Sequence, residues 1–166
     1  LTLRQLRPYQ REVALAILGS VFGKKGLTFS VEIARQGGKN ELSAQLELLL
    51  LTLYMAEPKN LIKCSPTFKP QTVISMMRLK DRLNDAGFDG IWAAELGYID
   101  KLGNARAVFL SADESSSVVG NTAHIILEID ESQAQALADR RFSNKNWQRK
   151  KTTAAFFVFL CSSGFF

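Results

Sequence analysis

Apolar and polar positions along the chain predict an alternating series of strands and helices. Short apolar runs predict buried strands at residues 27–33, 60–65, 124–129 and 154–160. Longer stretches rich in leucine or methionine predict helices at residues 41–56 and 69–86, which Pro58 and Gly87 bring to an end. Strands that alternate with helices of this length pair in parallel through crossover connections. The pattern therefore predicts a single α/β domain with a mainly parallel central sheet flanked by helices.

Weaker signals add detail to this prediction. Residues 97–112 predict two short strands around the turn Leu102-Gly103-Asn104, and a further helix is expected at residues 133–141. The helix at 69–86 brings one set of apolar residues near a single face: Val73, Met76, Met77 and Leu83.

The composition is that of a globular domain with a sizeable core. The chain has 166 residues, of which 46% are hydrophobic and 22% charged; a domain of this length buries about 70% of the surface of its unfolded chain. The net charge of +5 permits an anionic partner without requiring one. Cys64 and Cys161 lie far apart and the chain has one histidine, so neither a zinc site nor a disulfide framework is expected, and a reduced, cytosolic compartment fits best. The longest apolar run, at residues 48–55, is too short to span a bilayer.

The two ends indicate a piece of a longer protein. The chain begins at Leu1 and not at methionine, and its last stretch, TTAAFFVFLCSSGFF, is among its most apolar segments. A soluble protein rarely ends in an exposed apolar tail. We therefore expect residues 1–166 to form one domain that is a fragment of a longer chain.

The segment ARQGGKNE, residues 34–41, is a candidate phosphate-binding loop. It lies between a predicted strand and a predicted helix, so its backbone N–H groups would point at a ligand above the helix N-terminus, where the helix dipole favours an anion. The Gly37-Gly38 pair would let the backbone approach phosphate closely, and Lys39 would supply a positive charge. The segment departs from the usual pattern at Ile33 and Asn40, where glycine and serine or threonine are expected. A plain strand-to-helix turn is the alternative interpretation.

A second motif, HIILEIDE, places two acids directly after an apolar strand. An acid at the carboxyl end of a central parallel strand lies at the crevice where open α/β sheets bind ligands. Asp130 could hold Mg²⁺ there and Glu131 could orient and deprotonate an attacking water, whereas an acidic first turn of the next helix is the alternative. Glu128 interrupts the apolar strand, and because an unpaired buried carboxylate is costly it either faces the crevice or meets a basic neighbour. Together the two motifs predict nucleotide binding.

The segment RPYQ, residues 7–10, is a third candidate. The ring of Tyr9 could stack on a purine, and the amide of Gln10 could read the adenine edge with one donor and one acceptor. The same segment is also typical of a helix start, with Pro8 in the first turn, and the two interpretations are compatible.

With these motifs the chain resembles the ATPase domain of the large terminase subunit of tailed bacteriophages, which is the motor of DNA packaging. RPYQREV is similar to the adenine-binding segment of that family, ARQGGKN to its variant Walker A loop, and ILEIDESQ to its Walker B strand with the catalytic glutamate. KCSPTFKPQT resembles the strand and loop between these motifs in terminases and in superfamily-two helicases. The resemblance extends to about Thr153. It implies a P-loop NTPase of the additional-strand, helicase-like type.

The resemblance implies a role for each matching residue. Lys39 would bind the β- and γ-phosphates and Arg35 would stabilise charge on the γ-phosphate, while Glu131 would act as the general base. Asp130 would be the Mg²⁺ acid, with Asn40 as a second metal ligand. The nucleotide would contact residues of the first and second segments of the chain: Tyr9, Gln10, Arg35, Gln36, Gly37, Gly38, Lys39 and Asn40.

The resemblance also implies the setting in which the chain works. ATP and Mg²⁺ would be its cofactors, and Thr152 or Thr153 would couple hydrolysis to movement of the lobe that grips DNA. Double-stranded DNA would be translocated into a procapsid by a homo-oligomeric ring, expected to be a pentamer. The portal protein and the small terminase subunit would be its partners, in the host cytoplasm, on the procapsid and not at a membrane.

Some features leave alternatives open. Asn40 replaces the usual hydroxyl, and because an amide oxygen is also a hard ligand we expect altered rather than lost metal binding. A nuclease domain would follow the ATPase domain, so no cleavage of DNA is expected of residues 1–166.

The basic run at 140–151 could face DNA phosphate or donate an arginine to a neighbouring subunit, or it could be a solvated loop. Rival functions are the first lobe of a helicase or DNA translocase, and a nucleotide-binding assembly subunit without turnover.

Overall fold

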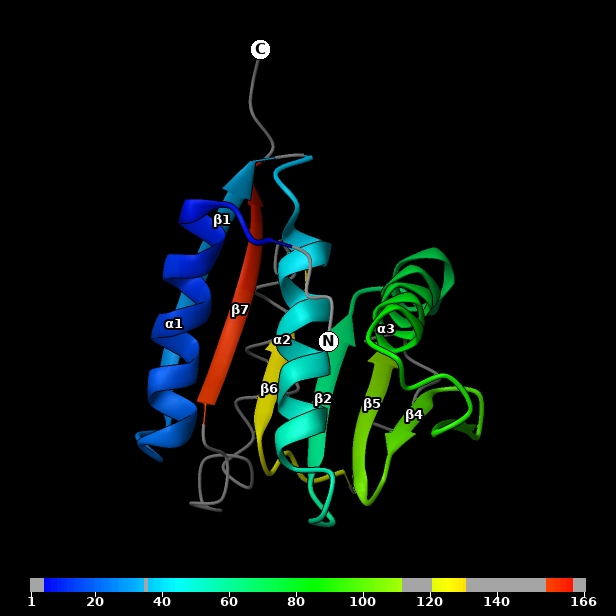
Figure 1. Cartoon of the computed structure of the whole chain (residues 1–166). Helices are drawn as coiled ribbons and strands as arrows, with labels where there is room; N and C mark the ends of the chain where they lie inside the picture. The colour runs from blue at the N-terminus through cyan, green and yellow to red at the C-terminus, as the bar shows by residue number, and fades with distance from the viewer. Residues whose placement is uncertain (1–4, 35, 112–120, 131–154, 163–166) are drawn as a thin grey trace.

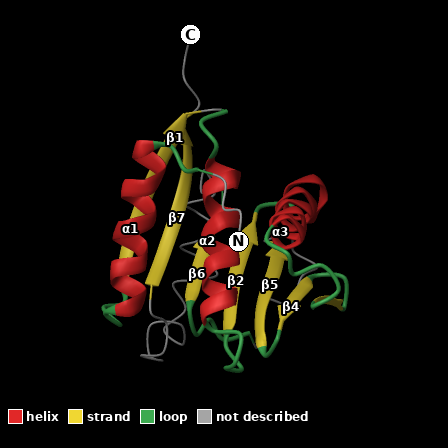
Figure 2. Ribbon diagram, in the orientation of Figure 1, coloured by secondary structure: helices red, strands yellow, loops and turns green. Residues whose placement is uncertain are grey.

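A computed structural model describes residues 5–34, 36–111, 121–130 and 155–162 of the protein, and within them seven strands form one sheet. The order across the sheet is β1-β7-β6-β2-β5-β4-β3 (Figures 1 and 2). The strands are β1 (Leu27–Ala34), β2 (Asn60–Ser65), β3 (Trp92–Glu95), β4 (Ile99–Leu102), β5 (Ala105–Ser111), β6 (Ile126–Ile129) and β7 (Ala155–Ser162). The helices are α1 (Pro8–Phe22), α2 (Lys39–Leu53) and α3 (Val73–Asp85), the last preceded by a single wide turn, η1 (Phe68–Thr72).

Most of the sheet is parallel, and its two strands at one edge, β4 and β3, are antiparallel. β1, β7, β6, β2 and β5 pair in parallel in that order, and β4 and β3 extend the sheet as antiparallel neighbours of β5. The turn between β4 and β5 contains Gly103 with φ 62°, and a Cβ there would collide with the carbonyl oxygen of Met55. The expected α/β fold with a mainly parallel sheet is thus confirmed, as a mixed sheet whose antiparallel edge is made by a tight hairpin.

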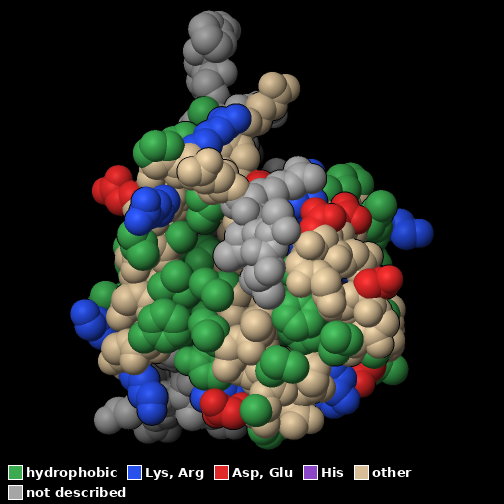
Figure 3. All heavy atoms as spheres, viewed as in Figure 1, with side chains coloured by type: hydrophobic (Ala, Val, Ile, Leu, Met, Phe, Trp, Pro, Cys, Tyr) green, Lys and Arg blue, Asp and Glu red, His purple; other side chains and the backbone are tan. Residues whose placement is uncertain are grey.

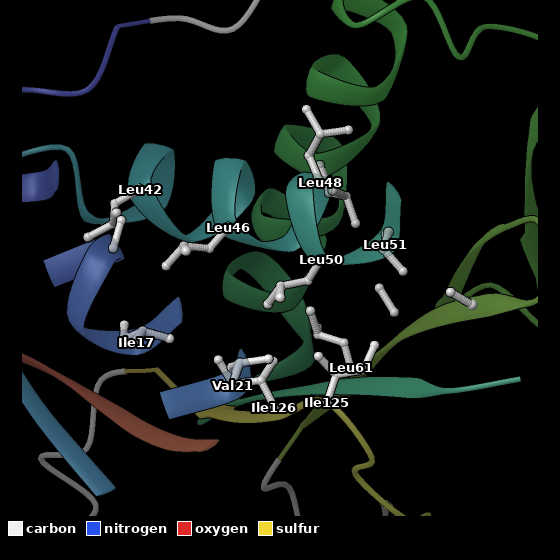
Figure 4. Close-up of a cluster of buried hydrophobic side chains, with 14 of the residues drawn as sticks. Ile17, Val21, Leu42, Leu46, Leu48, Leu50, Leu51, Leu61, Ile125 and Ile126 are labelled. Atoms are coloured by element: carbon white, nitrogen blue, oxygen red, sulfur yellow. The ribbon is translucent and has the colours of Figure 1, made fainter. Parts of the chain in front are cut away.

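The helices pack on one face of the sheet and enclose the main core. Figures 1 and 2 show α1 and α2 side by side in front of the strands, with α3 beside α2. In Figure 4, Leu46 and Leu50 of α2 point toward the strands, and Leu42 lies near Ile17 of α1. A second, smaller cluster lies on the opposite face, because strand side chains alternate: Leu61 belongs to the main core and Ile62 to the second cluster.

The outer surface of the helix layer is not uniformly polar. Figure 3 shows apolar side chains gathered over α1 and α2, with lysine and arginine side chains around them. Leu15 and Phe22 of α1 are 59% and 56% exposed, and Leu53 at the end of α2 is 52% exposed. These helices therefore carry apolar residues on both their inner and their outer sides.

The predicted helix at 69–86 is shorter in the structure, and one of the residues placed near its apolar face lies away from that face. Lys69 has extended backbone angles, φ −111° and ψ 130°, so the regular helix begins only at Val73. Met76 and Leu83 lie on the buried face of α3, but Met77 is 60% exposed. Met77 does not share that face because it follows Met76 by one residue, which is about 100° around the helix.

The other predicted elements differ only at their ends or lie outside the described residues. The helix predicted at 41–56 spans Lys39–Leu53, and the strand predicted at 124–129 spans Ile126–Ile129. Strand β3 was not predicted. The helix expected at 133–141 and the basic run at 140–151 lie outside the residues that the structure describes. Within the described part of the chain, no helix has both the length and the apolar character needed to cross a membrane.

Candidate nucleotide-binding site

The loop between β1 and α2 is a tight turn with no space for a side chain at Gly37. The N–H group of Gly37 donates to the carbonyl oxygen of Ala34 at 2.9 Å, and a Cβ on Gly37 would lie 2.5 Å from Cγ2 of Ile33. Gln36 and Gly38 both have positive φ, 59° and 79°, and Gly38 is the N-cap residue of α2. The turn therefore needs a glycine at each of its two central positions and directs the N-terminus of α2 to the carboxyl edge of the sheet.

Lys39 and Asp130 meet at this edge. The Nζ atom of Lys39, the first residue of α2, lies 2.5 Å from Oδ1 of Asp130, which directly follows β6. Both side chains are largely buried, with exposed fractions of 14% and 8%. The N–H group of Asp130 donates to the carbonyl oxygen of Cys64 at 2.8 Å, which ties it to β2. The glycine loop and the acid after β6 thus lie together, as the order of the motifs predicted.

The register of the sheet explains how the loop reaches Asp130. On β7, Ala34 of β1 is opposite Ser162, whereas Ile129 of β6 is opposite Val158, four residues earlier. At about 3.3 Å per residue, β1 therefore extends roughly 13 Å past the end of β6. The glycine turn folds the chain back across that distance, so that Lys39 at the start of α2 points at the end of β6.

Two side chains at the start of α1 donate hydrogen bonds to the glycine loop. The hydroxyl of Tyr9 donates to the carbonyl oxygen of Gly37 at 2.6 Å, and Nε2 of Gln10 donates to that of Gly38 at 2.9 Å. Oε1 of Gln10 accepts from the N–H group of Arg7 at 2.9 Å, so the same amide also caps α1. Gln10 is only 4% exposed, whereas Tyr9 is 41% exposed. Tyr9 is accessible to a purine. In Gln10, by contrast, both the oxygen and the nitrogen of the side-chain amide are bonded within the protein, and this amide fixes the loop.

A buried polar network lies one layer below the Lys39–Asp130 pair. Nζ of Lys63, on β2, lies 3.0 Å from Oε1 of Glu47 on α2 and 2.9 Å from Oε1 of Glu128 on β6. The hydroxyl of Ser43, on α2, lies between them: it donates to Glu128 at 2.6 Å and accepts from Lys63 at 2.5 Å. All four residues are at most 2% exposed. Of the two alternatives for Glu128, the structure shows the basic neighbour.

The network places two carboxyl groups beside one ammonium group in a site without water access. Burial, together with the carboxylate of Glu47, raises the pKa of Glu128 to about 8, against the attraction of Lys63. Burial lowers the pKa of Lys63, but the carboxylates of Glu128 and Glu47 outweigh it and hold that pKa above its ordinary value. Burial and the neighbouring carboxylate thus favour the protonated form of Glu128 beside the Lys63 ammonium group.

A weak signal of this network is present in the sequence, outside the three motifs. Lys63 stands within the apolar run NLIKCS, where a lysine is out of place unless it is paired. Ser43 and Glu47 follow Lys39 at intervals of four residues, which places all three on one side of α2. That their partners are Lys63 and Glu128 follows only from the pairing of β2 with β6.

A separate buried acid at the far side of the sheet predicts a pH dependence of stability. Asp100 on β4 is fully buried, and burial raises its pKa to about 6, although Lys80 lies 3.5 Å away. From about pH 4 to pH 6 the folded protein keeps a proton that the unfolded chain has released, so the free energy of unfolding falls as pH rises through this range. We expect Asp100→Asn to raise the free energy of unfolding by about 1–3 kcal/mol above pH 6. Urea denaturation between pH 4 and 8 tests this, and equal pH dependence in variant and wild type would contradict it.

The remaining predicted site residues are only partly covered by the structure. Asn40, the second residue of α2, is partly exposed beside Lys39, and its amide oxygen remains a predicted metal ligand. Gln36 is an exposed residue of the glycine turn. The predictions for Arg35, Glu131, Thr152 and Thr153 concern residues outside the described ranges. The described residues contain no cluster of three histidine, cysteine or acidic side chains that could hold a metal ion on its own.

Comparison with known proteins places this arrangement in a specific fold. No protein-family model matches the chain, and no curated protein matches it in sequence. Among solved structures, the ATPase domain of the Thermus phage P74-26 large terminase aligns with a TM-score of 0.60 at 15% identity, over 97% of this chain and 72% of that one. The chain has the fold of a phage large terminase ATPase domain.

Two longer large terminases share this terminase fold. The HK97 bacteriophage large terminase aligns with a TM-score of 0.63 at 16% identity, over 94% of this chain and 33% of its own length. The large terminase of a thermophilic bacteriophage aligns with a TM-score of 0.61 at 16% identity, over 95% of this chain and 39% of its own. The chain thus spans about a third of these two proteins, and the sequence resemblance to the terminase ATPase domain is confirmed at the level of the fold.

Proposed function

We propose that this chain is the ATP-hydrolysing motor domain of a phage large terminase, which translocates double-stranded DNA into a procapsid. The observation that carries the proposal is the Lys39–Asp130 pair: a lysine at the N-terminus of the helix after the glycine turn lies 2.5 Å from an acid at the end of β6. A phosphate-binding loop and a metal-binding acid must share one edge of a sheet to act on one triphosphate. The terminase fold supports the same function independently.

In this proposal each residue at the edge has a defined task. The N–H groups at the start of α2 and the ammonium group of Lys39 bind the β- and γ-phosphates. Asp130 and Asn40 supply the hard oxygen atoms for Mg²⁺, which suits a metal held by one or two protein ligands together with phosphate oxygens. Glu131 accepts the proton of the attacking water, and Arg35 stabilises the charge that develops on the γ-phosphate during in-line attack. When bound, Mg²⁺ neutralises charge on the phosphate oxygens.

The partners and the oligomeric state in this proposal are those suggested by the likeness to phage large terminases. The domain would work as a homo-oligomeric ring with the portal protein and the small terminase subunit, with Thr152 or Thr153 coupling hydrolysis to DNA movement. Because DNA would be held mainly through its phosphates, its affinity should depend strongly on salt and little on sequence.

Hydrolysis and DNA binding by the purified chain test the proposal. We expect phosphate release from ATP that requires Mg²⁺. We also expect a DNA affinity whose logarithm falls linearly with the logarithm of salt concentration, and which is equal within about threefold for unrelated duplexes. Phosphate release is measured with and without duplex DNA, and DNA affinity by fluorescence anisotropy. Bound nucleotide without turnover under every condition would favour an assembly role, and the absence of nucleotide binding would overturn the proposal.

Gln10 offers a prediction that separates two roles. If its amide supports the glycine loop, as its contacts with Gly38 and Arg7 indicate, Gln10→Ala should weaken ATP and GTP binding equally, by about threefold to tenfold. If the amide reads adenine, only ATP affinity should fall and the preference for ATP over GTP should be lost. Competition of each nucleotide with a fluorescent ADP analogue measures both affinities. Gln5→Ala, at an exposed glutamine just before α1, provides a control of the same residue type.

A further inference from the structure

The buried network connects the two elements that present Lys39 and Asp130. Ser43 and Glu47 belong to α2, whose first residue is Lys39, and Glu128 belongs to β6, which Asp130 follows. Lys63 of β2 contacts all three polar side chains at 2.5–3.0 Å. The network is therefore a direct bridge between the helix of the glycine loop and the strand of the acid.

The network lies at nearly the same distance from Lys39 along α2 as from Asp130 along β6. Ser43 follows Lys39 by four residues, about 6 Å along the helix axis at 1.5 Å per residue. Glu128 precedes Asp130 by two residues, about 6.6 Å along a strand, and side chains two residues apart share one face. The network thus forms a second layer parallel to the Lys39–Asp130 pair, so that movement of α2 along β6 would break both layers together.

The chemistry of the network indicates that it fixes the position of α2 relative to β6 more than it stabilises the fold. Replacing a buried ion cluster by well-packed apolar residues often leaves a protein equally stable or more stable, whereas removing one member leaves an uncompensated charge. Directional contacts with Ser43, Glu47 and Glu128 fix one position of α2 relative to β6, which leucines at the same positions would not do.

We propose that Lys63 is a positioning residue that sets the distance between the glycine-loop helix and the Asp130 carboxylate, and so the geometry in which a magnesium nucleotide binds. The inference rests on the proposed function, and it assigns to residues of α2, β2 and β6 a role that the sequence motifs did not give them. Binding of phosphates by the loop alone does not require this distance. Use of Mg²⁺ would, because Asp130 would hold the metal that neutralises charge on the phosphates.

Lys63→Met tests the inference, because methionine has a similar length and no charge. We expect the affinity for a fluorescent ADP analogue without Mg²⁺ to stay within about twofold of wild type, while the Mg²⁺ concentration for half-maximal turnover rises at least about tenfold. Hydrogen exchange of the amides at residues 38–42, measured without nucleotide, should be faster in the variant. A purely stabilising role would not change the Mg²⁺ requirement of protein that remains folded.

Two further variants separate positioning from loss of stability. Leu61→Ala is the matched control, since Leu61 lies two residues from Lys63 on the same face of β2, is fully buried and has no polar contact. It should lower stability without changing the Mg²⁺ requirement. The triple variant Glu47→Leu, Lys63→Met, Glu128→Leu removes all the charged groups of the network, so it should fold stably yet keep the raised Mg²⁺ requirement. It decides between the two roles if Lys63→Met alone does not fold.

The outcomes distinguish this inference from the proposed function. If wild type turns over ATP but Lys63→Met has the same Mg²⁺ requirement as Leu61→Ala, or if the triple variant recovers the wild-type requirement, the positioning role is wrong and the proposed function stands. If wild type binds nucleotide neither with nor without Mg²⁺, the proposed function fails and the inference fails with it.

Discussion

Replacing Lys39 with alanine is expected to lower ATP turnover by at least about 10³-fold and to weaken nucleotide binding without Mg²⁺ by at least about tenfold. The ammonium group of Lys39 lies at the N-terminus of α2, 2.5 Å from Asp130, so it is placed where the triphosphate would meet the acid. Its loss removes a positive charge from the position where negative charge develops on the γ-phosphate. Phosphate release and titration with a fluorescent ADP analogue measure the two effects.

A loss of stability has to be separated from this loss of function. Lys39→Ala leaves the carboxylate of Asp130 buried without its cation, which costs about 3–5 kcal/mol for a fully buried pair and less here, since the two side chains keep 14% and 8% exposure. The double variant Lys39→Ala, Asp130→Asn removes the unpaired charge and should regain most of the stability. Its affinity for nucleotide without Mg²⁺ should nevertheless stay low. Wild-type affinity in Lys39→Ala would show that the glycine loop is a plain turn.

The site could be predicted from the sequence where it depends on strand order and on glycine. Parallel strands end at a common edge, so the loop after β1 and the acid after β6 had to lie on the same side of the sheet. The Gly37-Gly38 pair marks a turn that side chains would prevent. These local rules were enough to predict that Lys39 and Asp130 lie close to each other, although the order of the strands between them was not known.

The rest depended on tertiary contacts that no local pattern contains. Lys63 and Glu128 meet because β2 pairs with β6, and their positions in the sequence are 65 residues apart. A purine-reading amide and a loop-fixing amide are the same residue type, so the sequence left the partner of Gln10 open, and the structure gives its contacts with Gly38 and Arg7. Strand β3 was missed because WAAE is short and carries little alternation.

Glu131→Gln is expected to lower ATP turnover by about 10²–10⁴-fold while nucleotide affinity stays within about threefold of wild type. Glutamine keeps the size and the hydrogen-bonding capacity of the side chain but cannot accept a proton from the attacking water. Glu131 directly follows Asp130, which the structure places beside Lys39, and this adjacency is the basis for assigning the base to it. Single-turnover phosphate release, compared with binding of the same fluorescent analogue, separates the chemical step from binding.

The control for this variant is an acid remote from the proposed site. Glu57→Gln removes the same charge from an exposed residue that pairs with Lys59 beyond the end of α2, and its turnover should equal that of wild type. If Glu131→Gln hydrolyses ATP at the wild-type rate, the base lies elsewhere, although the Lys39–Asp130 pair would still support nucleotide binding. If both variants lose nucleotide affinity to the same extent, the effect is one of net charge, because a base acts on the attacking water and only after the nucleotide has bound.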